Sequence, residues 1–362
     1  YEPSSQKNYN IEPSISTSYE IGTEFRLFNN RLWGDFNYYT RDDKDQIISV
    51  TSAPQSGYST RKMNAGLIRN RGVELSLGGM PVSTKNWKWE MNFNIAKNSN
   101  KLVELADGVD SYSIYWTSFT TRLYNYAMVG KSLGVITGNT WERDDNGNII
   151  FHELSASQKA LYGGEYVPTY NQNTLDELGN FHPDFTGGFN TSISFKNFRL
   201  SANIDFSVGG QIVSYTNMWG SSSGILDKTA ELNDRGVNVR EPVSKGGGIH
   251  MTGVDQDGNK VDTYVNAKLY YTTASRVWEE WVYDRTYVKL REVSLSYVFP
   301  SQTLKKLNIG LSRASVAINA SNPWLIYSAC PNVDVSEIGM GYFEGGNAAA
   351  TRSIGFTVNL AF

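Results

Sequence analysis

The sequence has a single cysteine, Cys330, among its 362 residues, so an intrachain disulfide is impossible. We interpret Cys330 as a small loop residue rather than a reactive thiol. The sequence also lacks any run of about eighteen apolar residues, which excludes a transmembrane helix. The three histidines, His152, His182 and His250, are too far apart in sequence to share a helix face. These shortages predict neither redox chemistry nor a metal site.

An excess of charge of one sign is also absent. The 33 Lys and Arg residues nearly balance the 36 Asp and Glu residues, and the basic residues are scattered, so no nucleic-acid surface is indicated. Gly209-Gly210 is not followed by the Gly-Lys-Ser/Thr pattern of a phosphate loop. The stretch from Asp144 to Asn148 lacks the spacing and closing Glu of a calcium loop, and its Asn146-Gly147 pair predicts a tight hairpin instead. We therefore expect no enzyme activity and no cofactor.

What the sequence does contain is typical of amphipathic β-structure. It has 33 Gly and 22 Tyr, and its mean hydropathy is −0.40. Side chains alternate between apolar and polar along many segments, as they do along strands with one apolar and one polar face. The clearest apolar series, in the last segment, is Ile354, Phe356, Val358, Leu360 and Phe362. Several charged residues fall on the polar face: Glu20, Glu24, Glu74, Glu90 and Asp205.

The links between these segments alternate strictly in length. Short links are predicted at 28–32, 77–87, 195–198 and 299–308, and long ones at 50–66, 103–183, 212–285 and 322–350. Outer-membrane barrels show this alternation because short turns face the periplasm and long loops face outside, whereas a soluble sandwich need not. The scheme gives about nine strands, too few to close a barrel without leaving edges in lipid. We therefore expect residues 1–362 to be the C-terminal portion of an outer-membrane β-barrel whose remaining strands lie upstream.

Two segments break the alternation. The apolar series of 293–299 changes phase above Arg291, and that of 308–320 changes phase near Ser312-Arg313. A β-bulge at each place would restore the register, because a bulge inserts one extra residue into a strand.

An ordered series of short motifs carries a family resemblance. It consists of Tyr19-Glu20-Ile21-Gly22, Asn70-Arg71-Gly72-Val73, Pro183-Asp184-Phe185-Thr186, Tyr287-Val288-Lys289-Leu290, Asn319-Ala320-Ser321-Asn322-Pro323 and the terminal Arg352 to Phe362. In this order the chain resembles successive barrel strands of the SusC/RagA family of TonB-dependent transporters. The segment from Cys330 to Val335 departs from the family because it lacks Asp-Pro-Glu.

The resemblance implies an all-β fold, a transmembrane antiparallel β-barrel of about 22 strands around a plug. It implies a multi-pass protein of the bacterial outer membrane, surrounded by lipid, that imports glycans or peptides. It also implies a SusD-like surface lipoprotein as partner and energy from TonB through the N-terminal part. The alternatives are a passive porin or adhesin barrel and a soluble glycan-binding sandwich or glycosidase. Charged residues on the polar strand face argue against the soluble alternative.

Aromatic residues in the long links are the candidate cargo-binding residues, because flat rings stack on sugars or hold apolar side chains. The competing interpretation is that these rings pack loop against loop. The residues are Tyr115, Trp116, Trp141 and Trp219.

Aromatic residues within the strands have a different predicted role. Tyr38, Trp87, Trp89 and Tyr297 are expected in the aromatic girdle at the membrane interface. Phe362 ends the chain on the apolar face, and the resemblance implies that it is a signal for barrel assembly as well as a membrane anchor.

Overall fold

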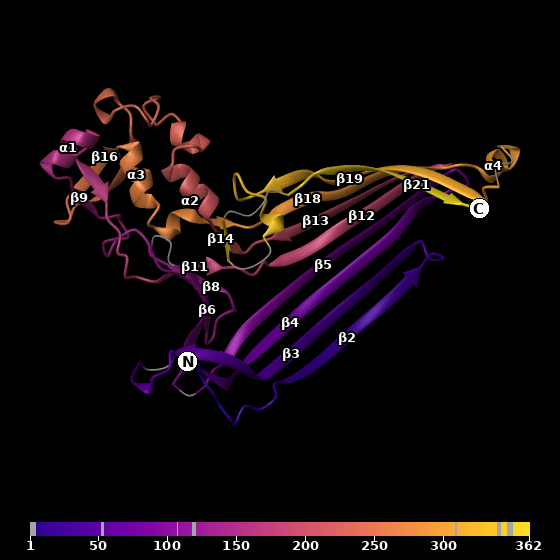
Figure 1. The fold of residues 1–362 in the computed structure, drawn as a ribbon, viewed down its shortest axis with the longest axis horizontal. Helices are drawn as coiled ribbons and strands as arrows, with labels where there is room; N and C mark the ends of the chain where they lie inside the picture. Colours follow the sequence, from indigo (N-terminus) through magenta and orange to yellow (C-terminus); the bar gives the residue numbers. More distant parts are fainter. Residues whose placement is uncertain are drawn as a thin grey trace.

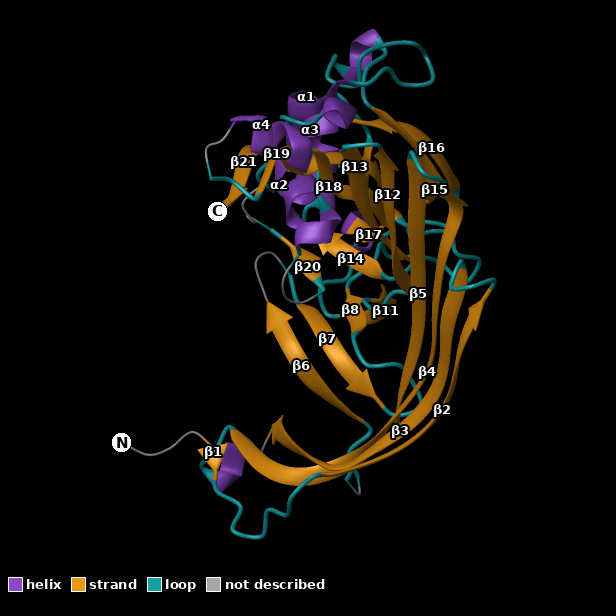
Figure 2. Cartoon of the chain, turned by 90° about the vertical axis from the view of Figure 1, so that its right-hand side faces the viewer, coloured by secondary structure: helices purple, strands orange, loops and turns teal. Residues whose placement is uncertain are grey.

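The computed structural model describes residues 5–51, 54–106, 108–117, 121–307, 310–338, 342–345 and 350–362. Its main feature is a curved ten-stranded sheet (Figures 1 and 2). One short strand, β1 (Ser5–Gln6), pairs with β4 off the main path, which leaves nine strands in chain order. These are β2 (Ile15–Leu27), β3 (Leu32–Thr51), β4 (Thr60–Ser83), β5 (Trp87–Glu104), β12 (Phe185–Phe195), β13 (Phe198–Val208), β18 (Tyr287–Val298), β19 (Arg313–Ser328) and β21 (Ser353–Ala361). Every pair along this path is antiparallel, which confirms the predicted strand order.

One face of the sheet is apolar across its width. The strand register places one apolar row over six strands: Trp89, Ile193, Leu200, Leu295, Ile318 and Phe356. All of these except Trp89 are exposed large hydrophobic side chains. A continuous apolar surface of this kind is stable against lipid, because in water it would drive association.

The opposite face is polar in the same register. A row three residues away along the same strands runs through Asn92, Asn190, Asn203, Glu292 and Ser321, and continues to Gly78 on β4. Amide side chains at successive strands give this face neutral donors and acceptors. The two faces thus follow directly from the alternation in the sequence.

The two predicted bulges have different outcomes. Asn203 pairs with Glu292 and Ile204 with Leu290, so Arg291 is the extra residue of a bulge, as predicted. The bulge predicted at Ser312-Arg313 is wrong, because β19 begins at Arg313 and pairs without a shift against β21. Asn308 and Ile309 lie outside the described residues.

The link predicted over 50–66 is much shorter than expected. β3 and β4 are 20 and 24 residues long and stay paired up to Thr51 and Thr60. Pairs with polar members continue this hairpin into the predicted link, where apolar alternation has stopped, for example Ser49 with Lys62. At the other end of the sheet, the β18–β19 link contains a helix, α4 (Ser301–Leu307).

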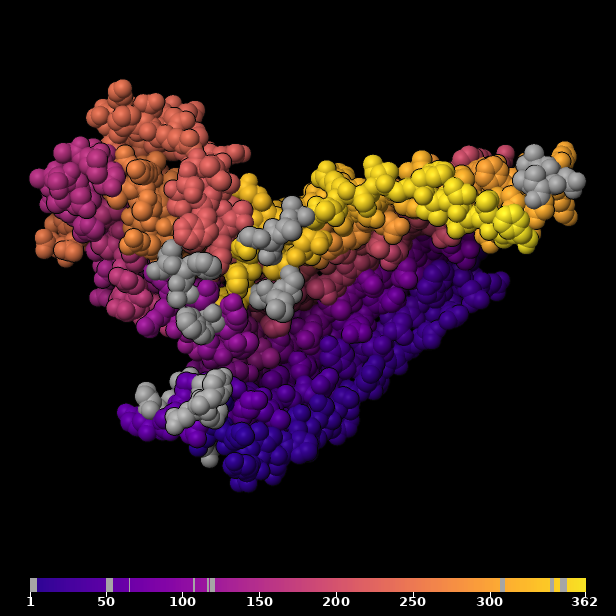
Figure 3. Space-filling model, in the orientation of Figure 1, coloured from indigo at the N-terminus to yellow at the C-terminus, as the bar shows by residue number. Residues whose placement is uncertain are grey.

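The three remaining long links fold together into what we call the loop unit (residues 105–184, 209–286 and 329–352, where described). The first link contains β6 (Ser111–Thr117), β7 (Leu123–Met128), β8 (Val135–Gly138), β9 (Phe151–Glu153), α1 (Ala156–Tyr162), β10 (Tyr166–Pro168) and β11 (Asp176–Asn180). The second contains β14 (Gln211–Ser214), α2 (Tyr215–Ser222), β15 (Ile249–Val254), β16 (Lys260–Val265), α3 (Ala267–Ala274), the 3-10 helix η4 (Trp278–Trp281) and β17 (Val282–Asp284). The third contains η5 (Val335–Glu337) and β20 (Phe343–Glu344). Figure 3 shows the unit at the end of the sheet opposite the C-terminus.

The main hydrophobic core lies in the loop unit rather than in the sheet, whose faces are both left open. Its largest fully buried side chains are Trp278 and Trp281, and it includes Trp141, Tyr215 and Tyr342 from all three links. The Trp281 indole donates a hydrogen bond of 2.7 Å to the Ala274 carbonyl. No helix within the described ranges is long and apolar enough to cross a membrane.

Local turns in the loop unit match their sequence signals. Ser155 and Gln158 form a complete capping box at the start of α1, and Gly163 ends the helix in the left-handed conformation. The Asn146-Gly147 hairpin also forms, with Arg143 paired to Ile149.

Candidate functional site

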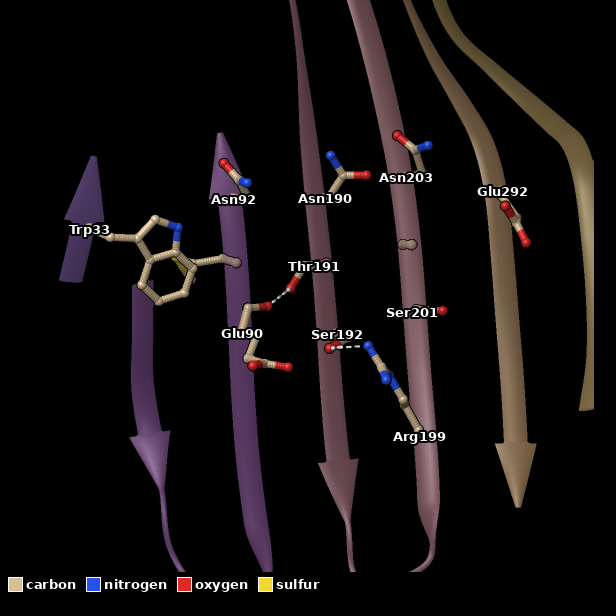
Figure 4. A pocket seen from close by; sticks show the side chains of 12 residues that line it. Trp33, Glu90, Asn92, Asn190, Thr191, Ser192, Arg199, Ser201, Asn203 and Glu292 are labelled. Atoms are coloured by element: carbon tan, nitrogen blue, oxygen red, sulfur yellow. Dashed lines mark hydrogen bonds between the residues drawn. The ribbon is translucent and has the colours of Figure 1, made fainter. Parts of the chain in front are cut away.

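The polar face of the sheet carries two adjoining hollows. The first, of about 350 Å³, is drawn in Figure 4 and is lined by polar side chains from four neighbouring strands together with Trp33. The second, of about 780 Å³, continues it toward the loop unit, and both are lined by Asn190 and Asn203. Its carboxylates are Asp35, Glu74 and Asp205. Together the two hollows form a polar track along this face of the main sheet, which we call the wall.

Glycines shape this track by making room for aromatic rings. A Cβ atom on Gly78 would lie 2.0 Å from the Trp33 ring, and one on Gly72 would lie 2.3 Å from the Tyr39 ring. Each glycine is the cross-strand partner of the aromatic residue itself, Gly78 of Trp33 and Gly72 of Tyr39. The rings therefore lie flat on the wall, an arrangement known to support glycines in sheets.

A charged network joins the wall to the third link. The Lys289 ammonium on β18 is almost fully buried and donates to Asp334 at 2.7 Å and Glu337 at 2.7 Å. Arg291, the bulge residue, donates to Asp205 at 2.8 and 3.0 Å and also contacts Glu337. The hydrogen bonds from Lys289 and then Arg291 hold the pKa of the Glu337 carboxyl below its usual range.

This network has a clear physical requirement. A buried ammonium is stable only when it is paired, so the third link must stay in place to satisfy Lys289. Sequence reasoning missed the role of Lys289. The available signal was that Lys289 falls on the polar phase beside the predicted bulge.

The four predicted aromatic residues lie in different surroundings. Tyr115 on β6 is 51 % exposed, and its ring centroid lies 5.8 Å from that of Phe343. Trp219 on α2 is 46 % exposed. Trp141 is only 2 % exposed. The side chain of Trp116 lies outside the described part of the chain. Tyr115 and Trp219 thus keep accessible faces, whereas Trp141 has none.

Trp141 is part of the packing between the first two links. Its indole donates a hydrogen bond of 2.6 Å to Glu280, and its ring stacks 6.2 Å from Tyr270. Burial, and then the Glu280 carboxylate, raise the pKa of Tyr270 far above its usual range. The loop-packing interpretation therefore describes Trp141.

Aromatic contacts also join all three links. Tyr115 of the first link contacts Phe343 of the third, and Phe343 contacts Tyr215 of the second at 5.1 Å. Tyr215 in turn contacts Trp278 at 5.3 Å.

Three of the four strand aromatics predicted for the girdle, Trp87, Trp89 and Tyr297, lie at the short-link end of the apolar face. Trp87 contacts Phe195 at 4.3 Å between ring centroids, and Tyr297 contacts Phe198 at 4.7 Å. Trp89 donates to the Thr191 hydroxyl at 3.0 Å, and Tyr38 is exposed further along the sheet. Phe362 follows β21 and is 86 % exposed.

Within the described ranges, no group of three or more His, Cys, Asp or Glu side chains is arranged to hold a metal ion. Cys330 is buried, and burial raises the pKa of its thiol to about 12. At neutral pH this thiol is protonated, which is the unreactive form.

The sheet, its two chemically opposite faces and the loop unit can be compared with known proteins. A family model described as "TonB dependent receptor-like, beta-barrel" matches residues 1–211, more than half of the chain. The chain belongs to this TonB-dependent receptor β-barrel family. The assignment confirms the predicted transmembrane antiparallel β-barrel fold and the outer-membrane character of the chain. It also makes the chain part of a receptor rather than an enzyme.

Individual relatives support the assignment to TonB-dependent receptors. TonB-dependent receptor P3 of Formosa agariphila is 28 % identical over 335 residues, which are 90 % of this chain and 31 % of the relative. TonB-dependent receptor SusC of Bacteroides thetaiotaomicron is 30 % identical over 214 residues, 57 % of this chain and 20 % of the relative. The solved RagAB peptide importer, in its "closed-closed" state, shares the fold with a TM-score of 0.70 at 19 % identity, over 96 % of this chain and 35 % of that one. Where a match covers most of this chain, the chain thus spans about a third of the relative's length.

Proposed function

We propose that the chain forms the C-terminal portion of the barrel of a TonB-dependent importer in the bacterial outer membrane. The observation that carries this proposal is the pair of rows on opposite faces of the sheet, one apolar and one polar. The apolar row faces lipid and the polar track faces the lumen. Upstream sequence supplies the plug and the strands that pair with β2 and β21, because open edges are untenable in a bilayer.

We further propose a SusD-like lipoprotein as the partner that covers the loop unit. The support is the similarity of the chain to SusC and to the RagAB importer. The loop unit also offers exposed apolar side chains, such as Leu161 and Ile225, well away from the sheet.

The proposed cargo is a glycan or a peptide that contacts the loop unit before it enters the lumen. Tyr115 and Trp219 support this role because both are accessible. We keep Trp116 in this proposal on its place in the sequence alone, and we assign Trp141 to packing that holds the unit in shape.

Energy-dependent uptake tests the proposal against a passive porin or adhesin. Cells that express the complete receptor would be given labelled cargo, with and without TonB and with and without a protonophore. If TonB drives import, uptake should fall to background both without TonB and with the protonophore, while the amount of receptor in the outer membrane stays constant. Uptake that continues without TonB would identify a passive pore.

A further inference from the structure

A hollow of about 340 Å³ lies within the loop unit, away from the polar track of the sheet. It is formed by β9, α1 and β10 of the first link and by α3 of the second, so it exists only when the two links are packed together. The volume falls within the range of about 300 to 1,000 Å³ that is typical of small-molecule sites.

The floor of this hollow is apolar and firmly packed. Leu154 and Val167 are 3 % and 4 % exposed and belong to a small hydrophobic cluster with Phe151, Val261 and Val265. Leu269 of α3 packs against the same cluster. The floor is thus preformed, so a ligand would not have to order it.

The rim is polar but carries no Asp, Glu, Lys or Arg. Among the described residues, the His152 imidazole and the Gln172 amide have no hydrogen-bond partner in the chain. The Tyr170 hydroxyl accepts one bond of 3.4 Å from Arg276 and keeps its own hydrogen available. A charged ligand would lose hydration here without gaining a counter-charge, so the lining selects an uncharged one.

We propose that this hollow binds one uncharged sugar unit of a glycan. A neutral sugar offers an apolar C–H face to the floor and hydroxyl groups that both donate and accept to the rim. An imidazole and a carboxamide each donate and accept as well, which matches that ring of hydroxyls. An apolar peptide side chain would use the floor and leave His152 and Gln172 unmatched. Only the role of the bound glycan as cargo rests on the proposed import function.

The test is binding to the complete receptor purified in detergent, measured by isothermal titration calorimetry. The probes are maltohexaose, laminarihexaose and cellohexaose as neutral glycans, a hexamer of galacturonate as the charged counterpart, and an apolar hexapeptide. At least one neutral glycan should bind saturably and more tightly than the galacturonate hexamer and the peptide. Gln172→Ala and His152→Ala should each weaken that binding about fivefold to tenfold, because each loses hydrogen bonds to the sugar.

Asn173→Ala is the matched control, since Asn173 is the exposed neighbour of Gln172 and does not line the hollow. It should leave glycan affinity unchanged, and all three variants should keep the melting temperature of the parent. Absence of saturable binding by every neutral glycan would overturn the proposal, as would equal affinities of the Gln172→Ala and Asn173→Ala variants or tighter binding of the peptide. Loss of TonB-dependent uptake with binding retained would refute import and leave the sugar site standing.

Discussion

His250 lies flat against Tyr264, with 4.7 Å between the ring centroids and 10° between the ring planes. Its two ring nitrogens contact two carboxylates, Asp234 at 2.9 Å and Asp262 at 2.7 Å. Ionised carboxylates only accept hydrogen bonds, so both contacts form together when the imidazole is protonated. Arg235 also lies over the Tyr264 ring, with its Cζ atom 3.5 Å from the ring centroid. These contacts attach the turn at 233–236 to the β15–β16 hairpin.

Acid should loosen this attachment. The hydrogen bond from Tyr264, and then the nearby His250, hold the pKa of Asp234 below its usual range. A carboxyl whose folded pKa is lowered contributes stability above its unfolded pKa of about 4, and that contribution is lost as pH falls through the folded value. Hydrogen exchange at residues 233–238 should therefore rise, after correction for intrinsic rates, below about pH 4. In Tyr264→Phe the loss should begin at higher pH, and an unchanged pH profile would contradict the assigned cause.

An arginine should destabilise the barrel on one face only. Ile204→Arg places a charge on the apolar face and should cost about 2 to 4 kcal/mol if the site is near the bilayer midplane. Asn203→Arg is the matched control, because Asn203 is the next residue along β13 and lies on the polar track. Unfolding of the reconstituted receptor in denaturant measures both. Equal losses at the two positions would show that the faces are wrongly assigned.

A side chain at Gly78 should disturb the wall. Gly78→Val requires the Trp33 ring to move, since the new Cβ would lie 2.0 Å from it, and overpacking of this kind costs about 1 to 3 kcal/mol. Gly79→Val is the matched control, because Gly79 is the next residue along β4 and a Cβ on it would meet only the Arg31 carbonyl oxygen, at an ordinary contact distance of 3.7 Å. We expect a lower melting temperature for the first variant alone. A similar melting temperature for both variants would mean that Trp33 adapts without cost.

The accessible and buried aromatics of the loop unit should separate in mutagenesis. Tyr115→Ala and Trp219→Ala should both weaken cargo affinity, because both rings are exposed. Trp219→Ala should leave the melting temperature unchanged, whereas Tyr115→Ala should also lower it slightly, because it loses the ring contact with Phe343. Trp141→Ala should instead lower stability by about 3 to 5 kcal/mol, as other buried tryptophans do. Calorimetric binding and thermal unfolding of the same preparations distinguish the two. Full cargo affinity in the Tyr115→Ala and Trp219→Ala variants would limit these rings to loop packing.

Deletion of Phe362 should affect assembly more than stability. The residue is 86 % exposed beyond the last strand, so it contributes little packing within the chain. Without it, we expect less assembled barrel in the outer membrane and a nearly unchanged melting temperature for the barrel that does assemble. Quantitative blotting of outer-membrane fractions and thermal unfolding provide the two measurements. Normal yield with reduced stability would leave Phe362 as an anchor only.

The sheet could be predicted from the sequence because each strand carries its own pattern. Within Trp87 to Ile95 and within Ile354 to Phe362, the alternation alone shows which side chains lie on the apolar face and which lie on the polar face. The bulge at Arg291 is visible as a change in the phase of the apolar alternation. The sequence predicts too short a β3–β4 hairpin because its outer part contains cross-strand pairs with polar members, such as Ser49 with Lys62, which leave no apolar alternation.

The loop unit could not be predicted in the same way, because its contacts join distant residues. Trp141 donates to Glu280, 139 positions away, and Tyr215 meets Phe343 across two links. Nothing in the neighbouring sequence separates buried Trp141 from exposed Trp219. The hollow lined by His152 and Leu269 likewise exists only after two links have packed together.

The contacts between Tyr115, Phe343 and Tyr215 limit how the entrance to the lumen can change. Displacing the third link would break the contacts of Phe343 with both other links, and displacing the first or second link would break its contact with Phe343 and the stack of Trp141 on Tyr270. Each ring contact is worth about 0.5 to 1.5 kcal/mol beyond the apolar area it buries. The ion pairs of Lys289 additionally tie the third link to the barrel wall. Mechanically, the described parts of the three links and the wall are therefore coupled into one canopy, and a force on one link is passed to the others and to the wall.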